Sequence, residues 1–281
     1  MNTPHHAASL RSIAAIIALA AASLSTGTHA AAVEATPASA GDKSITVGQY
    51  QLHTNLWGIA GAGTAWYEYL FTNSTTSIAG SGYKWSGFGG DTTTVKSYPS
   101  IRRGASNPGN DAGASGLPYQ FAGNTKNVDV LWNFTPTGYD GTGAISGTFN
   151  HAIDVFFSTG TVKNMANVRA EIMVIPDSSA NSQTQGWGTK DANAFVIDGE
   201  TWDVWQATMT SNGNSWPVMQ FRKRVKANYV SKNLKHFFAE ALARRPDVFL
   251  GTYYVLMVEA GTEVKSGSGK VYNKDFVVNV Y

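Results

Sequence analysis

Cysteine is absent from this chain of 281 residues. Disulfides and thiolate metal sites are therefore excluded. The histidines do not offer a metal site in their place. His5 and His6 stand near the N-terminus, and His53, His151 and His236 show no spacing of the HExxH kind.

Charged residues are also scarce. They make up 14% of the chain, the net charge is +2, and no block of lysine and arginine stands out. Nothing therefore indicates nucleic acid or an acidic membrane surface as a partner. Glycine (29 residues) and aromatic residues (12%) are abundant instead. That mixture suits an all-β protein with many turns and an aromatic-lined surface.

The first 31 residues resemble a secretory signal peptide. Arg11 supplies a positive charge, Ile13 to Leu24 is an apolar run, and Thr28 and Ala30 are small residues at the −3 and −1 positions of a cleavage site. The apolar run is too short to anchor the mature protein in a bilayer. We therefore expect a secreted protein, with residues 32–43 as a flexible leader and residues 44–281 as one domain.

That domain shows many short alternating segments separated by turns. A hairpin is predicted over residues 194–209, because Asp198-Gly199 separates two alternating runs. One helix is predicted over residues 232–242, with Ser231 as its cap. The long polar segment 100–118 is expected to be a lid or rim. Many strands with one helix predict a sandwich or jelly roll.

Three acids lie within predicted strands. Residues 167–176 form one strand in which Glu171 and Met173 share a face. Asp154 and Glu263 stand in two further strands. Two carboxylates that face each other across a cleft can cleave a glycosidic bond, one as acid and one as base or nucleophile. From spacing alone, three solvent-facing acids on a sheet remain an equally good interpretation.

The tryptophans favour the cleft. The chain has 8 of them, and their flat rings can stack on the apolar faces of sugar rings. Each one singly is more often a core residue, so we expect two or three of them to face a cleft.

Five motifs then resemble, in their order, those of the family 12 glycoside hydrolases, small jelly-roll endoglucanases and xyloglucan hydrolases. They are NLWG (55–58), WSG with VKSYP (85–87 and 95–99), IDVFF (153–157), EIMV (171–174) and AGTE (260–263). The resemblance covers about residues 44–281. It implies an all-β jelly-roll β-sandwich of two antiparallel sheets with one α-helix, acting as a monomer on β-glucan polysaccharide without metal or organic cofactor.

The resemblance also implies roles for single residues. Glu171 would be the nucleophile and Glu263 the general acid/base of a retaining double displacement, and Asp154 would support Glu171 by a hydrogen bond. The residues that would bind the substrate are Asn55, Trp57, Trp85 and Met173.

The chain departs from the family motifs beside the acids. Ile175 stands where the family usually has tryptophan, and Val264-Lys265-Ser266 replaces Pro-Phe-Thr. These changes leave open the preference among cellulose-like glucan, mixed-linkage glucan and xyloglucan. A non-catalytic carbohydrate-binding protein and a family 11 xylanase are the alternatives. The three acids argue against the first, and the AGTE, VKSYP and Trp57 motifs argue against the second.

Overall fold

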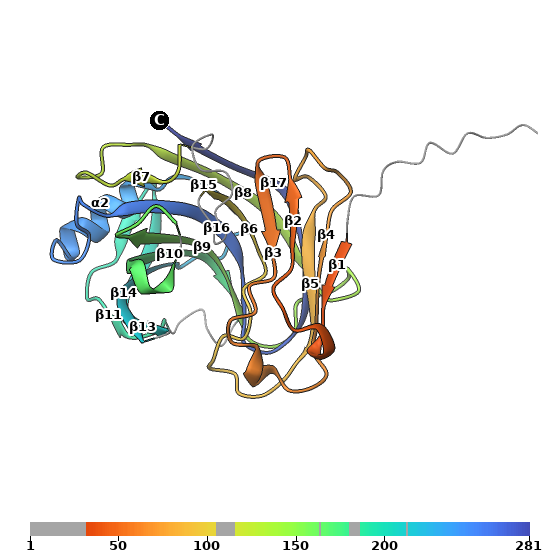
Figure 1. The fold of residues 1–281 in the computed structure, drawn as a ribbon. Coiled ribbons are helices and arrows are strands. Elements are labelled where there is room, and N and C mark those ends of the chain that lie inside the picture. The colour runs from red at the N-terminus through yellow and green to blue at the C-terminus, as the bar shows by residue number, and fades with distance from the viewer. Residues whose placement is uncertain (1–31, 105–115, 163, 180–185, 212) are drawn as a thin grey trace, which may run out of the picture.

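Two β-sheets pack face to face in the computed structural model (Figure 1). The structure describes residues 32–104, 116–162, 164–179, 186–211 and 213–281. The predicted signal peptide lies outside these ranges.

The small sheet has six strands, and its order joins segments from both ends of the chain. In spatial order they are β1 (Ala32–Ala35), β4 (Tyr67–Phe71), β5 (Gly82–Phe88), β17 (Gly267–Val280), β8 (Val128–Thr137) and β15 (Tyr229–Asn233).

The large sheet is strongly curved (Figure 1) and carries the predicted acids. Its order is β11 (Thr189–Lys190), β13 (Glu200–Ser211), β14 (Asn214–Lys223), β10 (Val168–Ser178), β9 (Phe149–Ser158), β16 (Tyr254–Val264), β6 (Ser100–Gly104), β3 (Tyr50–His53) and β2 (Ser44–Val47). Two short strands join it at the side, β12 (Phe195–Ile197) on β13 and β7 (Tyr119–Gln120) on β16. The 3₁₀ turns are η1 (Pro37–Ser39), η2 (Ile59–Ala62) and η3 (Met165–Asn167).

Among the strands that the structure describes, pairing is antiparallel except at one place. β10 and β14 run parallel, with Glu171 opposite Val218. A parallel pair needs a long connection, and the chain supplies it because it first forms the β13–β14 hairpin. That hairpin in turn places the start of β14 beside Glu171.

The core lies between the sheets. Alternation along β10 sends Ala170, Ile172 and Val174 into this core, where they meet residues of the small sheet such as Trp132. Met173 and Ile175 belong to a second apolar cluster, on the face of the large sheet turned away from the small sheet. The predicted faces of this strand are therefore confirmed from residue 170 onward. We call the face that carries Glu171 and Met173 the outer face.

The expected flexible leader is wrong for the described residues that follow position 31. β1 pairs with β4. Further on, the Asp42 carboxylate accepts hydrogen bonds from the Leu56 backbone at 2.7 Å and from the Thr54 hydroxyl at 3.4 Å. The chain before residue 44 is thus fixed to the sandwich by strand pairing and by the hydrogen bonds of Asp42.

Three other local expectations can be compared with the structure. The hairpin turn at Asp198-Gly199 is confirmed, with φ of 51° and 74°. The helix α2 spans Lys235–Arg244 rather than 232–242, because β15 takes residues up to Asn233, whose side chain accepts from the Lys235 backbone at 3.0 Å. Of the predicted rim, residues 100–104 form β6, and residues 105–115 lie outside the described residues.

Candidate active site

Three neighbouring strands of the large sheet bring the predicted acids to one face. β9 lies between β10 and β16. Asp154 on β9 stands opposite Met173 on one side and Glu259 on the other. Glu171 is the diagonal neighbour of Asp154, a separation that long side chains can bridge. Glu263 stands opposite Asn150, four residues before Asp154 on the same face.

Glu171 is nearly buried and holds a directed hydrogen bond. Only 4% of the surface of this residue is exposed to solvent. The indole Nε1–H of Trp216, at the start of β14, donates to Glu171 Oε2 at 2.7 Å. A donor to a carboxylate stabilises the ionised form. The parallel register of β10 and β14 therefore places a donor that favours the ionised form of this acid.

Glu263 has a different setting. It lines a cleft, and Asn150 Nδ2 donates to its Oε2 at 2.5 Å. The backbone around it is fixed by the segment before β6, because Val264 N donates to Ser97 O at 2.9 Å and Lys96 N donates to Val264 O at 2.8 Å. This acid is thus aimed by a side-chain amide but stays open to the cleft.

A further acid, Glu259 on β16, stands opposite Asp154. Glu259 is fully buried, and the Ser100 hydroxyl donates to its Oε1 at 2.6 Å. The Tyr98 hydroxyl donates to the backbone oxygens of Ala152 and Glu259, at 2.9 and 3.1 Å. Burial holds the pKa of Tyr98 well above its usual value, and the nearby carboxylates add to this. Tyr98 therefore acts as a neutral donor that ties β9 to β16 beneath the acids.

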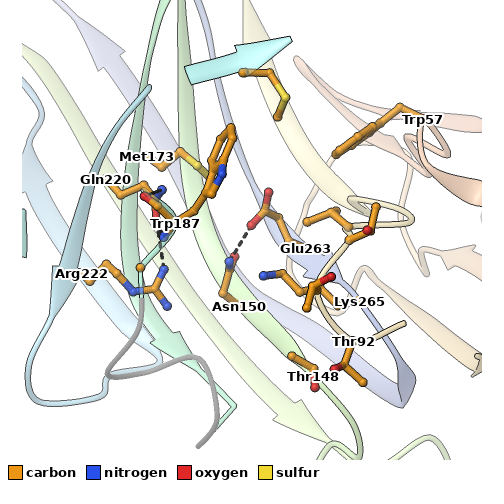
Figure 2. Close-up of a pocket in the computed structure, with 15 residues that line it drawn as sticks. Trp57, Thr92, Thr148, Asn150, Met173, Trp187, Gln220, Arg222, Glu263 and Lys265 are labelled. Carbon is orange, nitrogen blue, oxygen red and sulfur yellow. Dashed lines mark hydrogen bonds between the residues drawn. The ribbon is translucent and has the colours of Figure 1, made fainter. Parts of the chain in front are cut away.

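A cleft of about 610 Å³ opens over this face (Figure 2). Its lining is Trp57, Thr92, Thr93, Thr94, Val95, Thr148, Asn150, Met173, Gly186, Trp187, Met209, Gln220, Arg222, Glu263 and Lys265. Trp57 and Trp187 are 53% and 43% exposed. Figure 2 shows them on either side of Glu263. Two exposed indoles beside an acid offer apolar platforms for a chain of sugar rings.

Trp187 is held in place although it is exposed. The side-chain amide of Gln220 on β14 donates to Trp187 O at 3.1 Å and accepts from Trp187 N at 3.4 Å. A side chain that satisfies both backbone groups replaces a strand partner at this position. The sequence analysis did not single out Gln220 or Trp187, because the pairing joins loop and strand 33 residues apart.

Two of the predicted substrate-binding residues do not line the cleft. Trp85 is fully buried in the core between the sheets, since alternation along β5 puts it on the inner face with Tyr83. Its proposed sugar contact is therefore wrong. Asn55 lies in the turn after β3 with φ of 51°, and its backbone oxygen accepts from Tyr98 N at 3.0 Å. In this structure Asn55 shapes the turn that carries Trp57.

Several contributors were missed by the sequence analysis. Asn150 could have been found, because it shares a strand face with Asp154. Trp216 could not, because its contact with Glu171 depends on a pairing that joins distant parts of the chain. Within the described residues, no group of three or more potential ligand side chains is arranged to hold a metal ion. None of the helices in the described ranges has the length and apolar character needed to cross a membrane.

The comparisons with known proteins identify the family. Residues 48–280 match the family model of glycosyl hydrolase family 12, so the chain is a glycoside hydrolase and belongs to family 12. It is 28% identical over 238 residues to endoglucanase S of Pectobacterium parmentieri, covering 83% of this chain and 82% of that protein.

Two solved structures share the fold. A family 12 xyloglucanase from Bacillus licheniformis aligns with a TM-score of 0.73 at 22% identity, over 90% of this chain and 100% of that one. Endoglucanase 3 from Trichoderma harzianum aligns with a TM-score of 0.69 at 18% identity, over 89% and 98% of the two chains. The predicted jelly-roll sandwich is thereby confirmed.

Proposed function

We propose that this glycoside hydrolase is an endo-acting enzyme that cleaves β-1,4-glucosidic bonds in cellulose-like glucan, mixed-linkage β-glucan or xyloglucan. The observation that carries the proposal is the placement of Glu171 and Glu263 on one face of the large sheet, each held by its own hydrogen-bond donor. The family membership and the likeness to an endoglucanase support the substrate class.

The different settings of the two acids support distinct roles. Glu171 receives an N–H donor in a nearly buried position, which suits a nucleophile that must be ionised. Glu263 lines the cleft, where it can reach the leaving oxygen and later a water molecule. In the proposed retaining mechanism Glu171 attacks the anomeric carbon while Glu263 protonates the departing oxygen. Glu263 then deprotonates the water that releases the sugar.

Asp154 supports Glu171 in this proposal. It is the diagonal neighbour of Glu171 and stands directly opposite Met173. Met173 lines the cleft beside the acids, in a position to contact the sugar that is cut. We expect a separation of about 5–5.5 Å between the two catalytic carboxyl groups, as retaining enzymes require.

A carbohydrate-binding protein with no activity is the alternative from another class. The exposed Trp57 and Trp187 would serve it equally well. It offers no reason for a nearly buried carboxylate at Glu171, since burying an acid carries a free-energy cost unless it is compensated.

The test is release of reducing sugar by the purified protein from carboxymethylcellulose, barley β-glucan, xyloglucan and xylan in parallel, with Glu171→Gln as the matched blank. We expect release from one or more glucans, a rapid fall in viscosity as in endo cleavage, and a first product with retained anomeric configuration by NMR. Equal release by wild type and Glu171→Gln would reject the nucleophile. Glycan binding without release would favour the binding protein.

We also propose that the protein is secreted as a monomer. The support is the signal-peptide pattern of the first 31 residues. N-terminal sequencing of the protein from the culture medium should find a new terminus close to Ala30. Recovery of the uncleaved chain from the cell interior alone would contradict export. Light scattering of the purified protein tests the monomer.

A further inference from the structure

Positive charge predominates among the charged residues of the cleft lining. Within the described residues these are Glu263, Arg222 and Lys265. Under the proposed function, Glu263 has a chemical role and its charge acts on Arg222, whereas Lys265 has no assigned role. A neutral glucan carries no charge with which Lys265 could pair, so the presence of this second cation in the cleft needs another explanation.

Arg222 is a buried cation at the cleft. It follows Gln220 on β14 and is 4% exposed. Its guanidinium donates to Gln220 Oε1 and to the Ser178 hydroxyl, each at 3.3 Å. Burial lowers the pKa of Arg222 to about 10, and the charge of Glu263 opposes this. The side chain therefore stays positive at neutral pH, in a place where charge is costly.

Lys265 lines the same cleft, two residues after Glu263. Its backbone is fixed, because Lys265 N donates to Thr148 O at 2.9 Å. Within the described residues its amino group makes no hydrogen bond and no ion pair. Nearby lysines differ: Lys226 contacts Asp177 at 3.2 Å, and Lys223 contacts Glu200 at 2.7 Å. Figure 2 shows the amino group of Lys265 pointing toward Asn150 in the cleft.

The position of the cations relative to the tryptophans suggests what they meet. In Figure 2, Trp57 and Trp187 lie on either side of Glu263, and Arg222 and Lys265 both lie on one side of the line between the two indoles, with Asn150 between the cations. A sugar backbone stacked on the two indoles would pass over Glu263. Groups attached to that backbone could then extend toward the cations, where the Thr148 hydroxyl also lines the cleft.

We propose, building on the function proposed above, that Lys265 and Arg222 form a subsite for a carboxylate carried by the glucan chain near the bond that is cut. Ammonium and guanidinium groups bind carboxylates through charge-assisted hydrogen bonds. Walls of low dielectric strengthen such contacts in a cleft. The carboxylate could belong to a uronic acid unit or to a substituent on a neutral glucose unit.

The experiment compares polymers that share one backbone. Carboxymethylcellulose and hydroxyethylcellulose of equal chain length and degree of substitution are assayed with the wild-type enzyme, and the ratio of their kcat/KM values is the readout. A glucan oxidised at C6 provides the uronic acid arm, so the two sources of carboxylate are distinguished. We expect a ratio above one for at least one carboxylated polymer at low salt, falling about threefold or more at high ionic strength.

Variants assign the effect to the subsite. Lys265→Gln should lower the ratio about fivefold, the effect of one partly exposed ion pair, and Lys265→Arg should restore it. Lys274→Gln removes a lysine that is exposed on β17 and serves as the matched control, with an unchanged ratio. Because Arg222 is buried, the test rests on Lys265, with Arg222→Lys as a charge-preserving companion that should keep the preference.

The outcomes separate this inference from the proposed function. Cleavage of hydroxyethylcellulose with no preference for a carboxylated polymer, or a preference that survives in Lys265→Gln, rejects the subsite and leaves the endoglucanase standing. No cleavage of any β-glucan rejects both. Binding of carboxymethylcellulose by the inactive Glu171→Gln protein in affinity electrophoresis, weakened by adding Lys265→Gln, supports the subsite independently of turnover.

Discussion

The Trp216 indole donates a hydrogen bond of 2.7 Å to Glu171, and it does so across the parallel pair of strands in the large sheet. The bond links the proposed nucleophile to a residue 45 positions away. Because a hydrogen bond to the ionised form favours that form, the contact helps to keep Glu171 ready for attack. It also fixes the carboxylate in one orientation.

Replacing Trp216 by phenylalanine should therefore weaken catalysis more than stability. Hydrogen bonds to charged groups contribute about 1.5–3 kcal/mol, so we expect kcat to fall about 10- to 100-fold on barley β-glucan. The acid limb of the pH profile should move to higher pH, because the carboxylate loses a donor that favours its charged form. Trp202→Phe is the matched control, since Trp202 is also fully buried but lies in the inner core. Equal losses of kcat in the two variants would mean that Trp216 acts through packing and not through its hydrogen bond to Glu171.

Glu263→Ala should lose the first step on poor leaving groups and the second step on all substrates. General acid–base catalysis contributes about 10²- to 10⁴-fold, so we expect a loss of that order on polymeric glucan. On an aryl glycoside, azide should restore part of the rate and yield a glycosyl azide with retained configuration. It can attack the glycosyl-enzyme without help from a base. Glu171→Gln should gain nothing from azide; a gain there, or no rescue of Glu263→Ala, would contradict the roles given to the two acids.

The contrast between Trp85 and Trp57 shows what the sequence could and could not predict. Alternation and turn residues predict the strands, the hairpin and the faces of β10, because these depend on neighbours along the chain. The same alternation, applied to Tyr83 and Trp85, indicates that both residues lie in the core. Trp85 was assigned to the substrate instead because it belongs to one of the motifs that resemble the family. Contacts such as Trp216 with Glu171 and Asn150 with Glu263 depend on strand pairing. Alternation can place Asn150 on the face of Asp154 but cannot show that Glu263 is its partner, and Trp216 carries no local signal at all.

The predicted leader, residues 32–43, shows the same limit of prediction from sequence. Residues 32–43 are small and polar, which is typical of a mobile segment, yet β1 adds a strand to the edge of the small sheet. An unpaired sheet edge can accept almost any extended segment through backbone hydrogen bonds. Composition alone therefore could not predict this strand.

Trp57→Ala should weaken the binding of long oligosaccharides more than short ones. Trp57 is 53% exposed on a turn after β3, and covering an exposed indole with a sugar ring contributes about 1–2 kcal/mol. We expect KM for cellohexaose or a longer oligosaccharide to rise about tenfold, with little change for the shortest substrate that is cut. Tyr139→Ala, which removes an exposed ring outside the cleft lining, is the control. The same dependence on chain length in both variants would exclude Trp57 as a platform.

We expect His151 to lower the free energy of unfolding at acid pH. It is fully buried between the sheets, its Nδ1 lies 2.8 Å from the Thr262 hydroxyl, and burial lowers its pKa from 6.5 to about 3, with a smaller effect from Lys226. Between pH 6.5 and pH 3, His151 is therefore protonated in the unfolded chain but neutral in the native state. This contribution to stability is present above pH 6.5 and is lost as the pH falls toward 3. At pH 4.5 the loss is about 3 kcal/mol. Urea denaturation measures how far the unfolding free energy falls between pH 7.5 and pH 4.5. We expect this fall to be smaller in His151→Gln than in wild type, by about the amount that His151 contributes. The exposed His236→Gln should keep the wild-type difference; the same change in both variants would mean that His151 does not set the acid limit.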